Sequence, residues 1–357
     1  MDYKNWIQIK KQNLKNVLIS LSIIGILIYL IFSALSGIIN SIYYNPTTTI
    51  QSEESKYKKS DFYYGMKAYV SLNMPGYSAT SFTNEEEKGF GKYELTYSLK
   101  NRFYDEEESH ILKISRGRLT DGLDGIFGEK NRFKIWKGFE QVKKENVYKY
   151  NLEESGSGIQ ERNERTVQYL KELNPLSYIS MTIVFDRDLT MKEFYDMSKD
   201  HDNLDFVWVG VRTFKADRVK NENQLMSLVG FNPSLDESSS NYRPDSKKYP
   251  LFYLQDFLNN SDKIYSNEIY DNYGIHFKSR LEYLKNQKDY VNIFDYNPNK
   301  KEFYEEAIKY IDKNGIKTYG VRVFGKSKDF LESIDTIPYD SLYINEVLPV
   351  KSNIYYD

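Results

Sequence analysis

The sequence predicts an α+β protein: one N-terminal transmembrane helix, then an extracytoplasmic α+β region with mixed or antiparallel sheets. Residues 17–39 form one uncharged apolar run, and strands of alternating apolar and polar residues follow it. Toward the C-terminus the order helix–strand–helix–strand occurs at 166–214 and again at 302–347. A duplication would explain this repeat, although an ordinary α+β domain also produces such runs.

The apolar run at 17–39 is long enough to cross a membrane as a helix. Its 23 residues would rise about 34 Å, and the hydrocarbon core of a bilayer is about 30 Å thick. Residues 1–16 carry four lysines and one aspartate, so the positive-inside rule predicts a short basic cytoplasmic tail and an extracellular C-terminal domain. We therefore expect a single-pass protein of the cell membrane, in direct contact with the lipid bilayer.

A cleaved signal peptide is the alternative to a membrane anchor. Ala34, Leu35 and Ser36 have the small–x–small form of a cleavage site, with the cut after Ser36. The apolar core of a signal peptide is about 7–15 residues long, which is shorter than the run at 17–39. The length of the run therefore favours an anchor that is retained.

Composition excludes several classes of protein. The chain has no cysteine, which excludes disulfides, thiolate metal sites and cysteine nucleophiles. Its formal net charge is −2, whereas a nucleic-acid-binding protein needs a concentrated basic face, so no nucleic acid is expected as a partner. The 33 tyrosines and 20 phenylalanines supply apolar area for a core that needs no disulfides.

Changes in polarity along the chain predict its division into segments. A stretch with almost no apolar residues separates two external regions. The predicted segments are a basic tail at 1–16, a transmembrane helix at 17–39, a polar stalk at 40–60, a β-rich region at 61–150, a linker at 151–165, the main C-terminal domain at 166–347 and a tail at 348–357.

Two strands are predicted in the β-rich region. Apolar residues occupy alternate positions over 68–74, before Pro75 and Gly76 end the run. The same alternation covers 93–99. Both segments are expected in a half-buried antiparallel sheet.

The first helix–strand block of the C-terminal domain has three clear signals. Helical spacing over 166–173 precedes a strand at 179–185. Thr190 and Glu193 then form a capping box that begins the next helix. The nearly continuous apolar run at 206–214 is typical of a strand in the middle of a sheet.

The second block repeats the order of the first. Its elements are a helix over 303–311 that stops at Asn314-Gly315, a strand at 319–323, a short helix from Ser327 and a last strand through Leu342 and Ile344. Between the blocks, residues 277–284 indicate an amphipathic helix. We expect Phe185 and Trp208 in the core.

No catalytic, cofactor-binding or metal-binding residues are predicted. His110, His201 and His276 each stand alone, without the spacing of a metal site, and His201 is expected in a solvated turn. Residues 121–125 lack the bidentate glutamate of a calcium loop, and Gly156-Ser157-Gly158 lacks the third glycine of a dinucleotide-binding fingerprint. Because no nucleophile and base can be paired, we expect that the protein is not an enzyme and needs no cofactor.

Five segments carry a resemblance to a known family. They are MKAYVSLNMPGYSATSF at 66–82, GFGKYELTYSLKN at 89–101, SMTIVFDRDLTMKEF at 180–194, DFVWVGVRTF at 205–214 and SLVGFNP at 227–233. These segments resemble the N-terminal and C-terminal regions of the sigma factor regulator family. Members of this family are membrane-bound anti-sigma-factor-like proteins of Gram-positive bacteria. The second region of resemblance covers roughly 166–346.

The resemblance implies a role in signal transduction and transcription regulation. Family members restrain extracytoplasmic-function sigma factors, so the chain is expected to be a membrane-anchored regulator of such a sigma factor, with an external sensing or interaction domain. The alternative is an extracytoplasmic binding or scaffold module that is tethered to the membrane without direct sigma-factor contact.

The short tail leaves two routes to the sigma factor open. Residues 1–16 are too short to cover a sigma factor, and an isolated helix needs about 12–15 residues even to be marginally stable in water. Either the tail binds the sigma factor directly, or a second membrane protein holds it. The small residues that would let a second membrane helix approach are Ser22, Gly25, Ser33 and Gly37.

Overall fold

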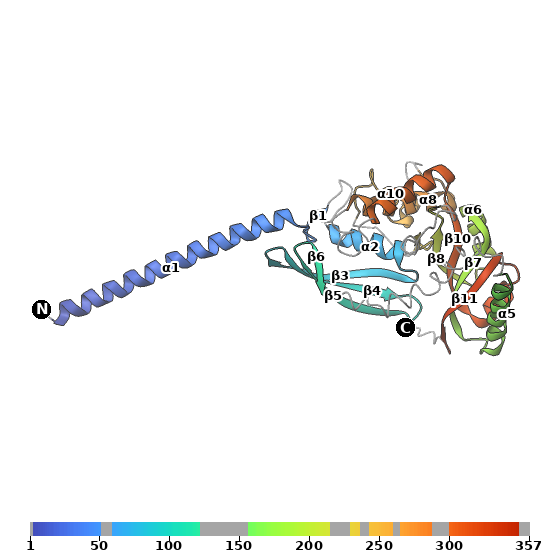
Figure 1. Cartoon of the computed structure of the whole chain (residues 1–357), viewed down its shortest axis with the longest axis horizontal. Helices are drawn as coiled ribbons and strands as arrows, with labels where there is room; N and C mark the ends of the chain where they lie inside the picture. The colour runs from blue at the N-terminus through green and yellow to red at the C-terminus, as the bar shows by residue number, and fades with distance from the viewer. Residues whose placement is uncertain are drawn as a thin grey trace.

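The fold is that of a computed structural model, which describes residues 3–50, 59–121, 156–214, 229–235, 243–259, 265–287 and 300–349. The predicted fold class is confirmed: an N-terminal apolar helix precedes an α+β region with antiparallel sheets. Figure 1 shows the order in space. Helix α1 projects from one end, a four-stranded sheet with helix α2 lies next to it, and a five-stranded sheet lies at the far end.

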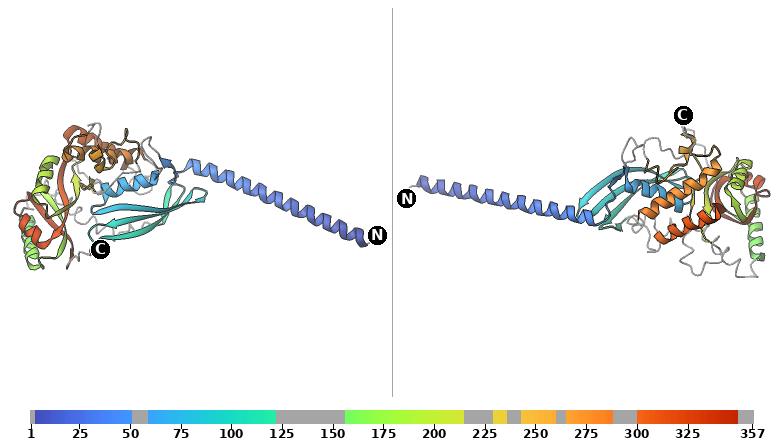
Figure 2. Two further views of the ribbon diagram at one scale, coloured as in Figure 1. Left: turned by 180° about the vertical axis from the view of Figure 1, so that it is seen from behind. Right: turned by 90° about the horizontal axis from the view of Figure 1, so that it is seen from above.

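Helix α1 (Tyr3–Ile42) contains the predicted apolar run and extends beyond both of its ends. The stretch Gln12–Ile42 is long and apolar enough to cross a membrane, and its most apolar part is not buried against the rest of the chain. Because α1 begins at Tyr3, most of the predicted tail continues the same helix. Two further views show α1 as one rod that leads away from the folded part (Figure 2).

The segment after α1 leads directly into helix α2. Strands β1 (Thr49–Ile50) and β2 (Lys59–Ser60) pair antiparallel, and the backbone N–H of Asp61 donates to the carbonyl oxygen of Thr48 at 2.8 Å. The described residues of the predicted stalk therefore include a helix end and two paired strands. Residues 51–58 lie outside the described part.

Helix α2 (Asp61–Asn73) occupies the position of the strand predicted over 68–74, so that prediction is wrong. Ser60 caps the helix, because its hydroxyl oxygen accepts a hydrogen bond from the backbone N–H of Tyr63 at 3.2 Å. Tyr63 is the one residue of α2 that is not buried. A helix that is buried on all sides has no polar stripe to mark its period, so its apolar residues also fitted the alternation of a strand.

The four-stranded antiparallel sheet packs against α2. Its strands, in spatial order, are β3 (Tyr77–Gly89), β4 (Lys92–Asn101), β5 (Glu106–Ser115) and β6 (Arg118–Asp121). The strand predicted over 93–99 is confirmed within β4. Its side chains Tyr93, Leu95, Tyr97 and Leu99 are buried, and the Tyr97 ring meets the Phe62 ring of α2 edge to face.

The five-stranded antiparallel sheet forms the centre of the C-terminal domain. Its spatial order is β11 (Tyr339–Leu348), β7 (Tyr178–Thr190), β10 (Lys317–Lys326), β8 (Asp205–Val211) and β9 (Gly230–Phe231). Strand β8 lies between β10 and β9, as its apolar sequence predicts, but it ends at Val211. The strands predicted at 179–185, 319–323 and 342–344 are confirmed.

The helices predicted in this domain are confirmed with changed bounds. They are α5 (Gly156–Glu172), α6 (Met191–Asp200), α8 (Ile269–Asn286), α10 (Lys300–Asn314) and α11 (Ser327–Ser333). The 3-10 helix η2 (Leu254–Asn259) was not predicted. Because α5 begins at Gly156, residues 156–165 of the predicted linker are helical. Residues 151–155 lie outside the described part.

The two helix–strand–helix–strand blocks have equivalent positions in the sheet. The first strands of the two blocks, β7 and β10, pair with each other. The second strand of each block pairs with the first strand of the other block: β8 with β10, and β11 with β7. The caps also correspond, because the N–H of Thr190 donates to Glu193 at 2.7 Å and the N–H of Lys326 donates to Asp329 at 3.3 Å. This symmetry agrees with a duplication, which stays a hypothesis.

One continuous core joins the two sheets. Helix α8 packs against α2 on one side and against α10 on the other. Leu72 of α2, Leu95 of β4, Ile183 of β7 and Leu281 of α8 all belong to the same buried cluster. The two sheets are therefore parts of one packed body.

Phe185 and Trp208 lie in the core, as predicted. Their side chains are 4% and 1% exposed. The indole N–H of Trp208 donates to the backbone oxygen of Ser71 in α2 at 2.9 Å, so β8 is bonded directly to the buried helix.

We expect Trp208→Ala to lower the free energy of unfolding by about 3–5 kcal/mol, because it empties a large buried site and removes this hydrogen bond. Guanidinium unfolding of the full chain in detergent, followed by circular dichroism, measures the change. Leu176→Ala is the control, since Leu176 is 48% exposed and should change stability little. Equal losses for the two variants would contradict this role of Trp208.

Candidate functional site

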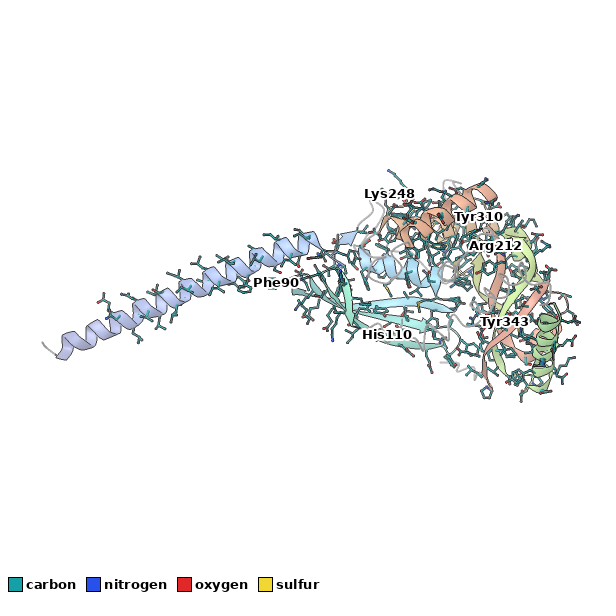
Figure 3. All side chains as sticks on the ribbon, viewed as in Figure 1. Phe90, His110, Arg212, Lys248, Tyr310 and Tyr343 are labelled. Atoms are coloured by element: carbon teal, nitrogen blue, oxygen red, sulfur yellow. The ribbon has the colours of Figure 1, made fainter. Side chains whose placement is uncertain are left out.

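The last turns of α1 contact the tip of the β3–β4 hairpin. The backbone N–H of Phe90 donates to Ser36 Oγ at 2.9 Å, and the N–H of Gly91 donates to Asn40 Oδ1 at 2.7 Å. The Phe32 and Phe90 rings meet edge to face, with centroids 5.8 Å apart. Figure 3 labels Phe90 at the end of the four-stranded sheet that is nearest to α1. Helix α1 and the sheet are thus joined by hydrogen bonds and by a ring contact.

A second hairpin tip lies beside the end of α1. The turn between β5 and β6 contains Arg116 and Gly117, and a Cβ atom on Gly117 would lie 3.8 Å from the backbone nitrogen of Tyr44. The N–H of Arg116 donates to the carbonyl oxygen of Gly91 at 2.7 Å, which holds the two tips together. Both hairpin tips therefore meet the segment where α1 ends.

A buried carboxylate, Asp61 of α2, joins the segment after α1 to α8. Its side chain is 4% exposed and accepts hydrogen bonds from the hydroxyls of Tyr44 at 3.0 Å and of Tyr283 at 2.6 Å. We name these three residues the Asp61 cluster. Burial raises the pKa of Tyr283 well above its ordinary value, and the neighbouring carboxylate raises it further, so the phenol stays protonated and donates.

The other end of α2 is bonded to both sheets. Lys67 Nζ donates to the backbone oxygen of Ala79 in β3 at 2.9 Å. Arg280 of α8 is 1% exposed, and its Nη1 donates to the backbone oxygen of Lys67 in α2 at 3.5 Å. With the bond from Trp208 to Ser71, these contacts hold α2 to the four-stranded sheet and to the C-terminal domain at once.

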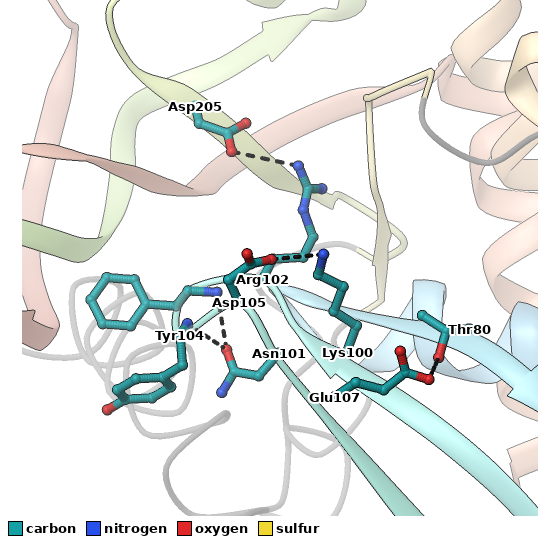
Figure 4. Close-up of polar contacts among 9 residues, drawn as sticks. Thr80, Lys100, Asn101, Arg102, Tyr104, Asp105, Glu107 and Asp205 are labelled. Carbon is teal, nitrogen blue, oxygen red and sulfur yellow. Dashed lines mark hydrogen bonds and ion pairs between the residues drawn. The ribbon is translucent and has the colours of Figure 1, made fainter. Parts of the chain in front are cut away.

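The far end of the four-stranded sheet meets the five-stranded sheet. In the turn between β4 and β5, the Phe103 ring stacks on Tyr178 with centroids 5.4 Å apart and meets Phe324 at 5.2 Å. Beside it, Arg102 Nη2 lies 3.5 Å from a carboxylate oxygen of Asp205, at the start of β8 (Figure 4). The sheet thus contacts α1 with one end and the C-terminal domain with the other.

A buried cation lies in the five-stranded sheet near this contact. Arg322 of β10 is 4% exposed, and its Nη1 donates to Ser180 Oγ at 3.1 Å. Burial lowers the pKa of Arg322 to about 10, while Glu346 raises it. The guanidinium is therefore charged at neutral pH, and the Glu346 carboxylate favours that charge.

The histidines do not come together. The His110 ring stacks on Tyr97 with centroids 5.7 Å apart, and burial lowers its pKa. His276 Nδ1 lies 2.8 Å from the backbone oxygen of Leu251. His201 is 9% exposed at the end of α6, so its predicted place in a solvated turn is wrong. Within the described ranges, no group of three or more His, Asp or Glu side chains is arranged to hold a metal ion.

The contacts of α1 differ from those that its sequence suggests. The small residues Gly25 and Gly37 lie free of the folded region that follows α1, because an added Cβ on either would meet no described atom within 4 Å. Ser36 and Asn40 instead make the contact, and their spacing of four residues on an apolar helix is the signal that sequence reasoning missed. The Asp61 cluster had no local signal, since its residues lie far apart in the sequence.

The comparison with protein families confirms the resemblance in the C-terminal part of the chain. Residues 170–336 match the family described as sigma factor regulator C-terminal. The matched range starts near the end of α5 and ends just after α11, so it includes β7, α6, β8 and β10. No curated protein and no solved structure matches the chain.

We expect Tyr283→Phe to lower the free energy of unfolding by about 1.5–3 kcal/mol, because it removes a hydrogen bond to a buried charged group. Denaturant unfolding of the full chain in detergent measures the change. Tyr169→Phe is the matched control, since Tyr169 is 45% exposed. If both substitutions left stability unchanged, the Asp61 cluster would have no part in holding α8 to α2.

Proposed function

Because residues 170–336 match the family described as sigma factor regulator C-terminal, we propose that the chain is a membrane-anchored regulator of an extracytoplasmic-function sigma factor. The family match is the observation that carries this proposal. Helix α1 supports the membrane anchoring, since Gln12–Ile42 is long and apolar enough to span a bilayer. The N-terminal lysines support a cytoplasmic N-terminus and an extracellular ectodomain.

In this proposal the ectodomain senses a condition or binds a partner outside the cell, and α1 carries the response across the membrane. Two contact routes connect the C-terminal domain to α1. One runs from Tyr283 of α8 through Asp61 to Tyr44. The other runs from Phe103 along the four-stranded sheet to Phe90, which contacts Phe32 of α1. These contacts support a response that moves α1 together with the ectodomain.

The sigma factor is reached directly by the N-terminal turns of α1 or through a second membrane protein. The second route is favoured by Gly25 and Gly37, which the described part of the chain leaves free for a neighbouring helix. The alternative function is an extracytoplasmic binding or scaffold module, which would leave transcription unaffected.

Protease treatment of intact protoplasts tests the topology. The proposed orientation predicts that added protease digests the C-terminal domain and leaves a short N-terminal fragment that contains α1. A tag at each terminus identifies the fragments, and permeabilised cells provide the control. Protection of the C-terminal tag in intact protoplasts would contradict the proposed orientation.

Transcription from sigma-factor-dependent promoters tests the function. Loss of the gene should raise the output of one extracytoplasmic-function sigma factor, and the full chain should restore restraint. A chain that lacks residues 2–10 but keeps Lys11 and Lys15 for orientation should lose restraint if the N-terminal turns take part. Unchanged transcription in all these strains would instead favour the scaffold module.

A further inference from the structure

The two hairpin tips beside α1 carry bulky residues where a turn disfavours them. Phe90 has a φ of 55° and Gly91 of 71°, and Gly89 pairs with Lys92 across this two-residue turn. Two positive φ values define the type I′ turn, which favours asparagine, aspartate or glycine. Phe90 is therefore a residue that local folding preference does not explain.

The second tip repeats this feature with a cation. Arg116 has a φ of 51° and Gly117 of 71°, and Ser115 pairs with Arg118 across the turn. Local preference again favours a small or polar residue at the first turn position. Adjacent tips thus present one aromatic and one basic side chain in strained backbone positions.

Phe90 lies at the level of the apolar part of α1. The ring of Phe90 contacts Phe32, which precedes the end of the apolar run at Ile39 by seven residues. At a helical rise of about 1.5 Å per residue, Phe32 lies inside the apolar run, about 10 Å from its C-terminal end. When α1 spans a bilayer, the Phe90 ring therefore lies among the acyl chains, about 10 Å inside the end of the apolar run.

The backbone N–H groups at the Phe90 tip have hydrogen-bond partners within the protein, as a position in lipid requires. The N–H groups of Phe90 and Gly91 donate to Ser36 Oγ and Asn40 Oδ1 of α1. The tip of a hairpin in water can leave such groups to solvent, whereas lipid requires partners within the protein. Helix α1 supplies these partners.

The charges around the tips complement lipid phosphate groups. The exposed cations at the two tips are Lys88, Lys92, Arg116 and Arg118. Of the nearby carboxylates, Glu86 pairs with Lys88 at 2.6 Å and Glu87 accepts a hydrogen bond from Asn40. Glu94 lies opposite Glu86 in the sheet, on the side of Lys88. Cations at headgroup level bind anionic lipids, as clusters of lysine and arginine beside membrane helices do.

We propose that residues 88–92 and 115–118 form a membrane foot that binds anionic lipids of the outer leaflet. Phe90 inserts its ring among the acyl chains, and Lys92, Arg116 and Arg118 contact the phosphate groups. The foot fixes the orientation of the ectodomain on the bilayer. This inference rests on the membrane anchoring of α1 that is proposed above.

Spin labels on single cysteines test the foot, because the natural chain has no cysteine. The full-length chain carries the label at Phe90→Cys in vesicles of phosphatidylcholine and phosphatidylglycerol. Leu27→Cys in α1 and Ile111→Cys on β5 are the controls, since both side chains are exposed in the fold. We expect the labels at 27 and 90 to be accessible to oxygen and protected from a water-soluble nickel complex, and the label at 111 to show the opposite.

The controls separate failure of the foot from failure of the anchor. A label at 90 that is as accessible to nickel as the label at 111, while the label at 27 is protected, overturns the foot and leaves the anchor in place. A label at 27 that is accessible to nickel overturns the anchor and the foot together.

Charge substitutions test the lipid that the foot binds. In the Phe90→Cys chain, Lys92→Gln, Arg116→Asn and Arg118→Gln together should raise nickel access to the label several-fold in vesicles that contain phosphatidylglycerol. In pure phosphatidylcholine the same substitutions should have little effect. Asparagine suits the turn position of Arg116, so the thermal unfolding midpoint should not fall. Equal effects in the two lipids would overturn the binding of anionic lipids.

Discussion

The structure depends on the burial of helix α2 on nearly all sides. This helix lies between the four-stranded sheet and helix α8, and Tyr63 is its one residue that is not buried. Burial of a side chain such as Phe62 or Leu72 stabilises the fold by about 1.5–3 kcal/mol. Because these residues contact both sheets through one core, the two sheets cannot separate without exposing α2 to water.

Hydrogen bonds at both ends hold this buried helix in one orientation. Asp61 binds Tyr44 and Tyr283 at its N-terminal end, and Ser71 accepts a hydrogen bond from Trp208 near its C-terminal end. A hydrogen bond to a buried group is costly to lose, because the remaining partner has no water to replace it. The segment after α1, helix α8 and strand β8 are therefore held in one arrangement about α2.

The sequence predicts the parts of the fold that have a clear period or cap. The strands around Ile183 and Val321 alternate or are continuously apolar, and Thr190 with Glu193 forms the predicted capping box. Helix α2 was predicted as a strand because burial on every side removes the polar stripe that distinguishes the two periods. His201 was placed in solvent because Thr336, which lies near its ring, belongs to the distant second block.

The candidate site could be predicted only in part, because its contacts join distant segments. Phe90 and Ser36 are 54 residues apart, and Tyr283 and Asp61 are 222 residues apart. Single-sequence patterns report neighbours within one helix or strand and carry no information about such pairs. The apolar helix at 17–39 and the family match of residues 170–336 were predictable, but the contacts between these parts were not.

The contacts through Asp61 and along the four-stranded sheet hold the C-terminal domain and α1 together as one rigid unit. The most direct test is the distance between spin labels at Ile38→Cys in α1 and Leu176→Cys before β7, measured by double electron–electron resonance in the full chain in lipid nanodiscs. Both side chains are exposed, so the labels fit without disturbing the core. If the two parts move as one rigid unit, the labels give one narrow distance distribution. A broad distribution, or one with several distances, would contradict the rigid unit.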